Sequence, residues 1–139
     1  MIVLDTNVVS ELIRPRPAAR VVDWVRRQAA PSLYLSSISE AELRYGVEVL
    51  PEGSRRQKLR VAVEGLLRED FAGRILPFES DAARAYALIA ASRRATGHPI
   101  SRADCQIAAI ARSVGASVAT RDTGGFEGCD VGVVSPWSD

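Results

Sequence analysis

Four acidic residues of this sequence stand where their carboxylates can act together. They end predicted strands or begin predicted helices: Asp5, Glu42, Asp104 and Asp122. In a sheet of parallel strands, the carboxyl ends of the strands and the amino ends of the following helices meet at one rim, where such sheets bind ligands. The positions of the four acids therefore predict that they share one pocket at that rim.

Carboxylates crowded into one pocket repel each other, which raises the proton affinity of at least one of them unless a cation neutralises the site. The four acids offer hard oxygen ligands, and no histidine or cysteine belongs to the set. Such ligands favour Mg²⁺, or Mn²⁺ in its place, over zinc. The chemistry they predict is hydrolysis by a metal-activated water, which requires no side-chain nucleophile.

A purely structural interpretation of the same acids stays open at this point. Residues 39–42 and 101–104 both match the capping box, in which a serine and an acid satisfy free backbone groups at a helix start. Asp5 can cap the helix that follows it, and Asp122, before two glycines, can be a turn residue. What favours a joint site is that all four acids fall at one predicted rim.

The spacing of apolar residues predicts the elements that would position these acids. Short apolar runs predict five strands, near residues 2–4, 33–38, 74–78, 117–120 and 131–134, the last as an edge strand. Helical spacing predicts one helix directly after Asp5 and others near 18–29, 39–50, 55–70, 80–95 and 101–114. The helix at 39–50 is apolar around most of its circumference, which predicts a buried helix. Strands that alternate with helices predict an α/β fold with a mainly parallel sheet of about five strands and helices on both faces.

The bulk properties limit the class of protein. The 139 residues, 47% of them hydrophobic, suit a single domain over 1–139 with its own core. The net charge of +1 gives no global field that would attract nucleic acid. Cys105 and Cys129 have neither the number nor the spacing of a zinc site or a disulfide framework. No segment approaches the roughly 20 apolar residues of a membrane span, so we expect a cytoplasmic protein with reduced thiols and no membrane partner.

Four segments spread along the chain carry a family resemblance. They are Ile2-Val3-Leu4-Asp5-Thr6-Asn7, Ser39-Glu40-Ala41-Glu42-Leu43 with Gly46 after it, Ser101-Arg102-Ala103-Asp104 with Ile107-Ala108-Ala109 after it, and Thr120-Arg121-Asp122 leading to Phe126-Glu127-Gly128. In this order they resemble the PIN-domain proteins, specifically the VapC toxins of type II toxin–antitoxin pairs and their FitB-like branch. The resemblance implies a small PIN-like α/β/α sandwich and a Mg²⁺-dependent endoribonuclease that a cognate antitoxin inhibits.

The resemblance also assigns roles by position. The two principal metal ligands would be Asp5 and Asp104. Two further acids would complete the site directly or through water, namely Glu42 and Asp122. Two hydroxyl side chains would orient carboxylates or water, namely Thr6 and Thr120. Many relatives have asparagine where Asp122 stands, which makes this residue the least secure ligand. RNA as substrate, a homodimer and a toxin–antitoxin hetero-oligomer on operator DNA are implied in the same way.

Physical chemistry favours an arginine as the antitoxin residue that would enter the acidic pocket. A cation blocks an acidic pocket best, and the planar fork of arginine pairs carboxylates bidentately where lysine cannot. We therefore expect a small partner protein to insert an arginine-bearing segment among the four acids. Its apolar flank would pack on the first helices, where the candidate contacts are Val9, Leu12, Trp24 and Tyr45.

Two other functions were weighed against this one. A phosphotransferase of the haloacid-dehalogenase type also begins with a strand and an aspartate, but it needs a second aspartate two residues on, where this chain has Asn7. A catalytically silent PIN-like module would only bind nucleic acid or a partner, and the loss of an acid would support it. All four acids are present, which favours the enzyme.

Overall fold

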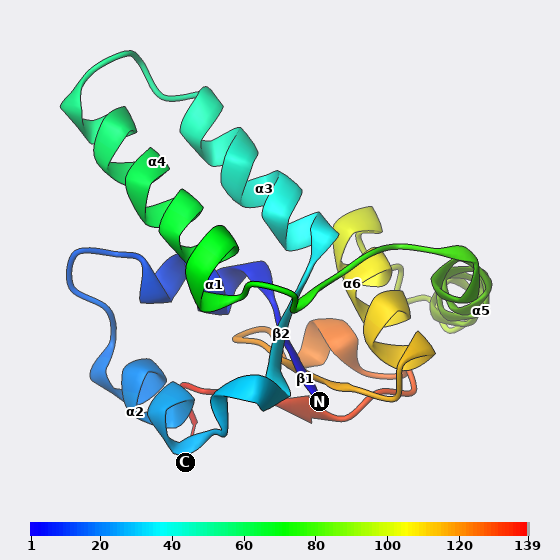
Figure 1. Ribbon diagram of the computed structural model, residues 1–139. Coiled ribbons are helices and arrows are strands. Elements are labelled where there is room, and N and C mark those ends of the chain that lie inside the picture. The colour runs from blue at the N-terminus through cyan, green and yellow to red at the C-terminus, as the bar shows by residue number, and fades with distance from the viewer. Residues whose placement is uncertain (139) are drawn as a thin grey trace.

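The computed structural model describes residues 1–138, which form a five-stranded sheet between two layers of helices (Figure 1). The strands are β1 (Ile2–Leu4), β2 (Leu33–Ser36), β3 (Ile75–Leu76), β4 (Ser117–Ala119) and β5 (Val133–Val134). Their order is β3-β2-β1-β4-β5, and every neighbouring pair is parallel. The expected parallel sheet, with its last strand at an edge, is confirmed.

Within the described residues, six α-helices connect and cover the strands. They are α1 (Thr6–Leu12), α2 (Ala19–Arg27), α3 (Ser37–Glu48), α4 (Ser54–Gly65), α5 (Ser80–Ala95) and α6 (Arg102–Ser113). Helix α4 continues into a π-helical turn, Leu66–Asp70, so together they cover the helix expected near 55–70. Two short 3₁₀ turns, Ala30–Ser32 and Gly124–Phe126, complete the set. None of these helices is both long and apolar enough to cross a membrane.

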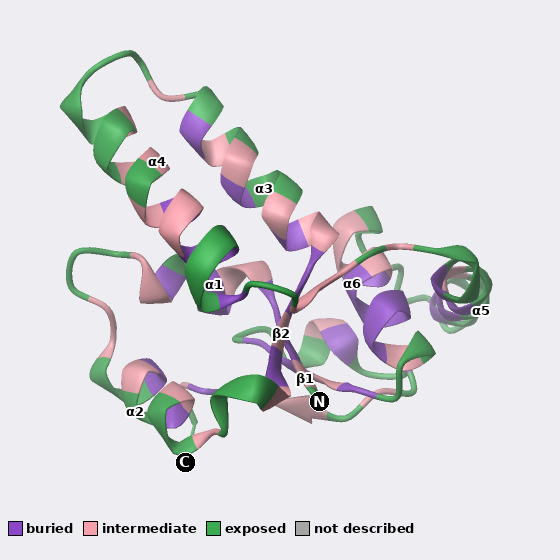
Figure 2. Cartoon of the chain, in the orientation of Figure 1, coloured by how far each residue is buried: buried purple, intermediate pink, exposed green. Residues whose placement is uncertain are grey.

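Two hydrophobic cores lie on opposite faces of the sheet, because successive residues of a strand point to opposite faces. On β1, Val3 packs in the core formed with α5 and α6, whereas Leu4 packs in the core formed with α1 to α4. On β4, Val118 and Ala119 divide between the two cores in the same way. Figure 2 shows buried positions concentrated on the sides of the helices that face the sheet. The expected three-layer α/β/α sandwich is therefore confirmed.

The junction of β2 and α3 lies earlier in the chain than expected. The strand expected at 33–38 ends at Ser36, whose Oγ accepts a 3.1 Å hydrogen bond from the Ser39 N–H and caps α3. Serine at this position satisfies one of the free backbone donors of the first helical turn. Ser39 is thus inside the helix and is not its cap, so the capping box expected at 39–42 is wrong.

The expectation that α3 is buried all round is also wrong. Leu43 and Val47 are buried, but Tyr45 is 69% exposed and Val49 is 56% exposed. The cause is visible in Figure 1, where α3 and α4 form a hairpin that extends away from the sheet and leaves the outer side of α3 uncovered. Apolar residues on all sides of a helix therefore did not mean burial here.

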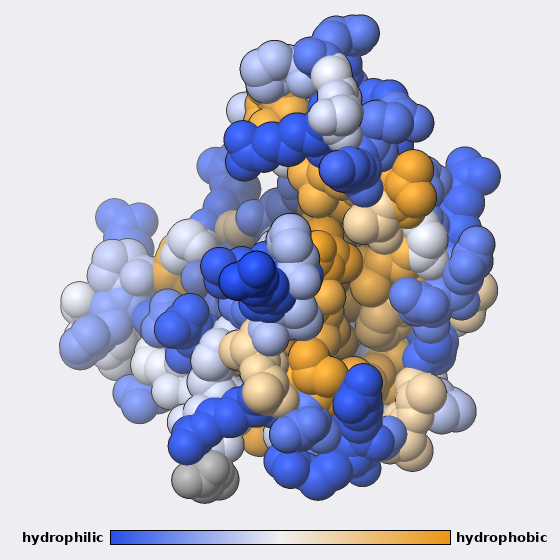
Figure 3. Space-filling view, turned by 90° about the vertical axis from the view of Figure 1, so that its left-hand side faces the viewer, coloured by the Kyte–Doolittle hydropathy of each residue, from blue (hydrophilic) through white to orange (hydrophobic). Residues whose placement is uncertain are grey.

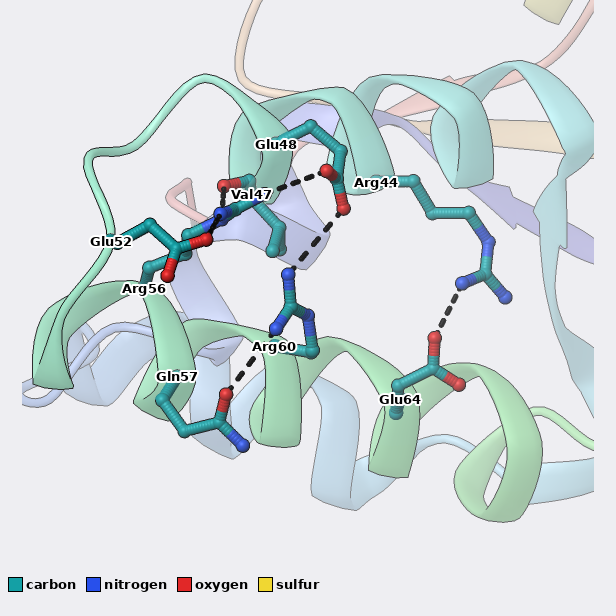
Figure 4. Close-up of polar contacts among 8 residues, drawn as sticks. All are labelled: Arg44, Val47, Glu48, Glu52, Arg56, Gln57, Arg60 and Glu64. Carbon is teal, nitrogen blue, oxygen red and sulfur yellow. Dashed lines mark hydrogen bonds and ion pairs between the residues drawn. The ribbon is translucent and has the colours of Figure 1, made fainter.

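Ion pairs across the hairpin hold α3 against α4 (Figure 4). Arg56 Nη2 lies 2.7 Å from Glu48 Oε2, and its Nε donates a 3.2 Å hydrogen bond to the Val47 carbonyl. Nearer the sheet, Arg44 Nη1 lies 2.5 Å from Glu64 Oε1. These pairs join the two helices of the hairpin at both of its ends.

Candidate functional site

Asp5 lies at the centre of the rim, directly after the central strand β1. The register of β1 against β4 pairs Leu4 with Ala119, which places Asp5 beside Thr120. Asp5 Oδ1 accepts a 2.7 Å hydrogen bond from the Thr6 N–H and caps α1, and Asp5 Oδ2 accepts a 2.8 Å bond from the Thr120 hydroxyl. The side chain is therefore both a helix cap and a fixed member of the rim.

The pKa of the Asp5 carboxyl depends first on its burial and then on the polar and acidic groups around it. The residue is 5% exposed, and burial is the main cause that raises the pKa of its carboxyl above the ordinary value. The hydrogen bonds from Thr120 and Thr6 lower this pKa, while the nearby carboxylates of Asp104 and Glu42 raise it. The net shift is upward, because burial and like charges disfavour the ionised form. A cation at the rim would relieve both effects.

A chain of hydrogen bonds between hydroxyl groups leads through Thr6 to Glu42. Thr6 Oγ1 donates a 2.8 Å hydrogen bond to Glu42 Oε1 and lies 2.8 Å from Ser39 Oγ. A hydroxyl has a single proton to donate, so Ser39 must be the donor to Thr6. Behind them, Ser36 Oγ donates to Ser39 Oγ at 3.4 Å. Glu42, exposed on the first turns of α3, is thereby held at the rim by a residue of α1.

Asp104 comes to the rim from α6. Ser101 caps this helix, and its Oγ accepts the Asp104 N–H at 3.2 Å, so this expected cap is confirmed. Within residues 1–138, however, the Asp104 carboxylate accepts no hydrogen bond, and it faces an open cavity of about 510 Å³. Asp5, Thr6 and Glu42 line the same cavity. Three of the four candidate acids, from three separate elements, thus meet in one place.

Asp122 does not line this cavity. The residue is exposed, and its Oδ1 accepts a 3.1 Å hydrogen bond from the Gly125 N–H in the turn after β4. Its own N–H donates to Thr120 Oγ1 at 3.1 Å, the hydroxyl that also bonds Asp5. Asp122 is therefore connected to the cavity through Thr120, and its carboxylate acts as a turn residue.

Four further polar residues line the cavity and were not among the predicted site residues: Asn7, Ser10, Glu11 and Arg14. Asn7 Nδ2 donates to Thr120 Oγ1 at 3.3 Å, and its Oδ1 accepts the Arg121 N–H at 3.2 Å. Glu11 is buried, and its pKa is lowered chiefly by the 2.9 Å hydrogen bond from the Ala18 N–H, with help from Arg14 at 3.0 Å. A glutamate on the apolar helix α1, three residues before an arginine, was the signal available in the sequence.

The donor set suits a hydrated hard cation. Among residues 1–138, no three His, Cys, Asp or Glu side chains lie close enough together to hold a metal ion. Asp5, Glu42 and Asp104 offer only carboxylate oxygens to this cavity, and the pKa of Asp5 is raised chiefly by burial and further by the two neighbouring carboxylates. Mg²⁺ dehydrates reluctantly and usually keeps several waters beside one or two carboxylates. The residues present therefore fit Mg²⁺ or Mn²⁺ better than an ion that needs a full protein cage.

A family model described as the PIN domain matches residues 2–130 of the chain. This match covers most of the sequence, including all four candidate acids, Asp5, Glu42, Asp104 and Asp122. The α/β fold and the acidic rim accord with it. The chain belongs to the PIN-domain family.

The chain is similar over nearly its whole length to several known proteins. It is 48% identical over 137 residues to plasmid stability protein StbB of Pseudomonas syringae pv. tomato, covering 99% of both chains. It is 45% identical to VapC ribonuclease Y4jK of Sinorhizobium fredii, covering 99% of this chain and 98% of that protein. Toxin FitB of Neisseria gonorrhoeae is 46% identical and covered in full. The solved structure of FitAB bound to a DNA fragment has a TM-score of 0.93 and 45% identity, over 100% of this chain and 97% of that one.

Proposed function

We propose that this protein is a Mg²⁺-dependent endoribonuclease that acts as the toxin of a toxin–antitoxin pair. The observation that carries the proposal is the meeting of Asp5, Glu42 and Asp104 in one open cavity, with a raised pKa at Asp5. Similar proteins named as a ribonuclease and as a toxin support it. The reaction is hydrolysis of a phosphodiester bond in RNA.

Each residue of the site has a proposed task. Asp5 and Asp104 hold the cation, with Glu42 and Asp122 acting directly or through water. Thr120 orients Asp5 through its 2.8 Å hydrogen bond, and Thr6 orients Glu42 in the same way. When bound, Mg²⁺ supplies Lewis-acid polarisation of a phosphodiester oxygen and acidifies an attacking water. The protein's own contribution is to bring carboxylates from three elements to one cavity, with Asp5 and Glu42 oriented by hydroxyl hydrogen bonds.

A groove beside the acids offers a surface for the antitoxin. A second cavity of about 530 Å³ shares Thr6 and Glu42 with the acidic one and continues between α1, α3 and α4 over apolar side chains: Ile13, Leu43, Leu50, Leu59 and Val63. Figure 3, which views the side where α2 and α4 lie in Figure 1, shows a hydrophobic band hollowed between hydrophilic rims. An arginine in the acidic pocket and an apolar segment in this groove would together inhibit the enzyme.

The structure revises the residues expected to contact the antitoxin. Val9 and Trp24 are buried in the core, so they cannot form its surface. Leu12 lines a further apolar cavity together with Ile13, which continues the groove towards α2. Tyr45 is exposed on α3. Proposed in addition are assembly as a homodimer and, with the antitoxin, a hetero-oligomer on operator DNA, which is supported by the DNA-bound FitAB complex.

An RNA cleavage assay tests the proposal. Purified protein should cut RNA with Mg²⁺, and EDTA should stop it. Asp104→Asn should abolish cleavage, whereas the matched control Asp23→Asn, an exposed acid on α2, should not. A protein that binds RNA or a partner but cuts nothing in Mg²⁺ or Mn²⁺ would favour the catalytically silent module.

A further inference from the structure

Arg93, in the last turns of α5, is a buried cation behind the acidic rim. Only 9% of the residue is exposed. Its Nε donates a 2.6 Å hydrogen bond to the His98 carbonyl, and its Nη1 donates to the carbonyls of Gly125 at 2.9 Å and Glu127 at 2.6 Å. One guanidinium therefore binds the backbone of two separate loops.

A buried guanidinium is costly unless hydrogen bonds compensate for the water it loses. Within residues 1–138, no carboxylate lies within ion-pair distance of Arg93, and the three carbonyl oxygens take that role. An apolar side chain would fill the same space without this cost. What arginine adds is a rigid planar fork that fixes several acceptors at once.

One of the two loops carries Asp122. Arg93 holds the Gly125 carbonyl, and the Gly125 N–H donates to Asp122 Oδ1 at 3.1 Å, so a single residue separates the guanidinium from the carboxylate. The approach at this point is close, because a Cβ on Gly125 would lie 2.5 Å from Asp122 Oδ2. The loop also contains Gly128 with a φ of 74°, and its turn at Gly124–Phe126 lies beside α6 (Figure 1).

The other loop leads to Asp104. His98, whose carbonyl Arg93 holds, lies three residues before Ser101, the cap of α6. The Ser101 hydroxyl in turn receives the Asp104 N–H at 3.2 Å. The place where α6 begins, and with it the position of Asp104 at the cavity, is thus tied to the same guanidinium.

We propose that Arg93 is a positioning residue that fixes Asp104 and Asp122 relative to each other from behind the rim. This role rests on the proposed metal-dependent function. Arg93 touches none of the four acids, so it is not a catalytic residue. Replacing a residue that orients metal ligands without binding the metal itself typically changes metal affinity or activity by about 10- to 100-fold.

Three variants test the proposal. Arg93→Lys keeps the charge without the fork, and Arg93→Met keeps only the bulk. Arg94→Lys, at the exposed neighbouring position, is the matched control. The readouts are Mn²⁺ affinity by titration without RNA, hydrogen exchange of the Gly125 amide, and kcat and KM for RNA cleavage.

Both Arg93 variants should weaken Mn²⁺ binding by about tenfold or more. They should also speed exchange at Gly125 and lower kcat while KM changes little, whereas Arg94→Lys should match the wild type. A folded Arg93→Met with wild-type Mn²⁺ affinity and Gly125 protection would overturn the role. If Arg93→Met does not fold, Arg93→Lys decides by the same criteria. If the wild-type protein binds no Mn²⁺, the proposed function and this role both fail. If the wild type binds Mn²⁺ and the Arg93 variants bind it equally well, only the role of Arg93 fails.

Discussion

The Thr120 hydroxyl donates a 2.8 Å hydrogen bond to Asp5 Oδ2, joining two residues that lie 115 positions apart in the chain. The pairing of β1 with β4 brings them together, because Leu4 stands opposite Ala119. Thr120 Oγ1 accepts from Asn7 Nδ2 and from the Asp122 N–H, so its one proton is directed to Asp5. The buried carboxylate is thus held in a fixed orientation, and this hydrogen bond lowers the pKa of Asp5 against the larger effect of burial.

Replacing this hydroxyl should disturb the charge of Asp5. Thr120→Val keeps the shape but leaves a buried oxygen without its donor, which should cost roughly 1–3 kcal/mol of stability. Since the Thr120 bond lowers the pKa of Asp5, that pKa should rise and the acidic limb of the pH–activity profile should move to higher pH. Thr120→Ser retains the hydroxyl and serves as the control. An unchanged acidic limb in Thr120→Val would contradict this role.

Asp5→Asn should reveal the crowding of the rim in stability measurements. The pKa of Asp5 is raised by folding, so the folded state binds its proton more tightly than the unfolded chain. The ionised carboxylate therefore destabilises the fold at high pH, and this cost fades as the pH falls towards the ordinary pKa of 3.8.

In EDTA at pH 8, Asp5→Asn should be as stable as the wild type or more stable, with the difference shrinking at acid pH. Urea denaturation of both proteins across this range measures it, with Asp23→Asn as the control. A loss of about 1 kcal/mol or more at pH 8, the size of a broken hydrogen bond, would show that the contacts of Asp5 outweigh the repulsion.

Mg²⁺ or Mn²⁺ should raise the melting temperature. An ion that binds only the folded state at a concentration 100 times its Kd stabilises it by about 2.7 kcal/mol. Asp104→Asn should reduce the shift strongly, and Asp23→Asn should leave it unchanged. Activity that required zinc after exhaustive removal of Mg²⁺ and Mn²⁺ would contradict the preference for a hard ion.

The antitoxin should act through arginine. Co-expression of this protein with the small protein encoded beside it should give a complex that cuts no RNA. Changing the arginine that enters the acidic pocket to alanine should restore cleavage, because the carboxylates then keep their cation. Equal inhibition by every arginine variant would place the block elsewhere, in the apolar groove.

Both thiols should be unreactive in the folded protein. Burial raises the pKa of Cys105 to about 11, and burial also raises that of Cys129. Both residues are 1% exposed or less, so a reagent has no access to either sulfur, and the raised pKa values disfavour the reactive thiolate. Ellman's reagent should titrate no thiol in native protein and two after unfolding. Rapid reaction of either thiol in the native state would show local opening of α6 or of the loop after Asp122.

Much of this molecule follows from local sequence. The apolar run Ile2-Val3-Leu4 predicted a central strand because a strand buried on both faces needs no alternation. Ser101 predicted the start of α6, because its hydroxyl can satisfy a free N–H without help from distant residues. The position of acids at strand ends and helix starts was likewise enough to predict the rim.

Only the tertiary structure shows which acids line the cavity and which residues hold them in place. Glu42 joins the cavity because Ser36, not Ser39, caps α3, and because Thr6 of another element binds its carboxylate. Asp122 does not line the cavity, and its carboxylate instead accepts the Gly125 N–H in the turn after β4. Arg93, next to an exposed arginine, gave no local sign of its burial. The contact of Glu42 with Thr6 and those of Arg93 with the loop at 125–127 join residues more than 30 positions apart, and only the packing of the helices on the sheet brings such residues together.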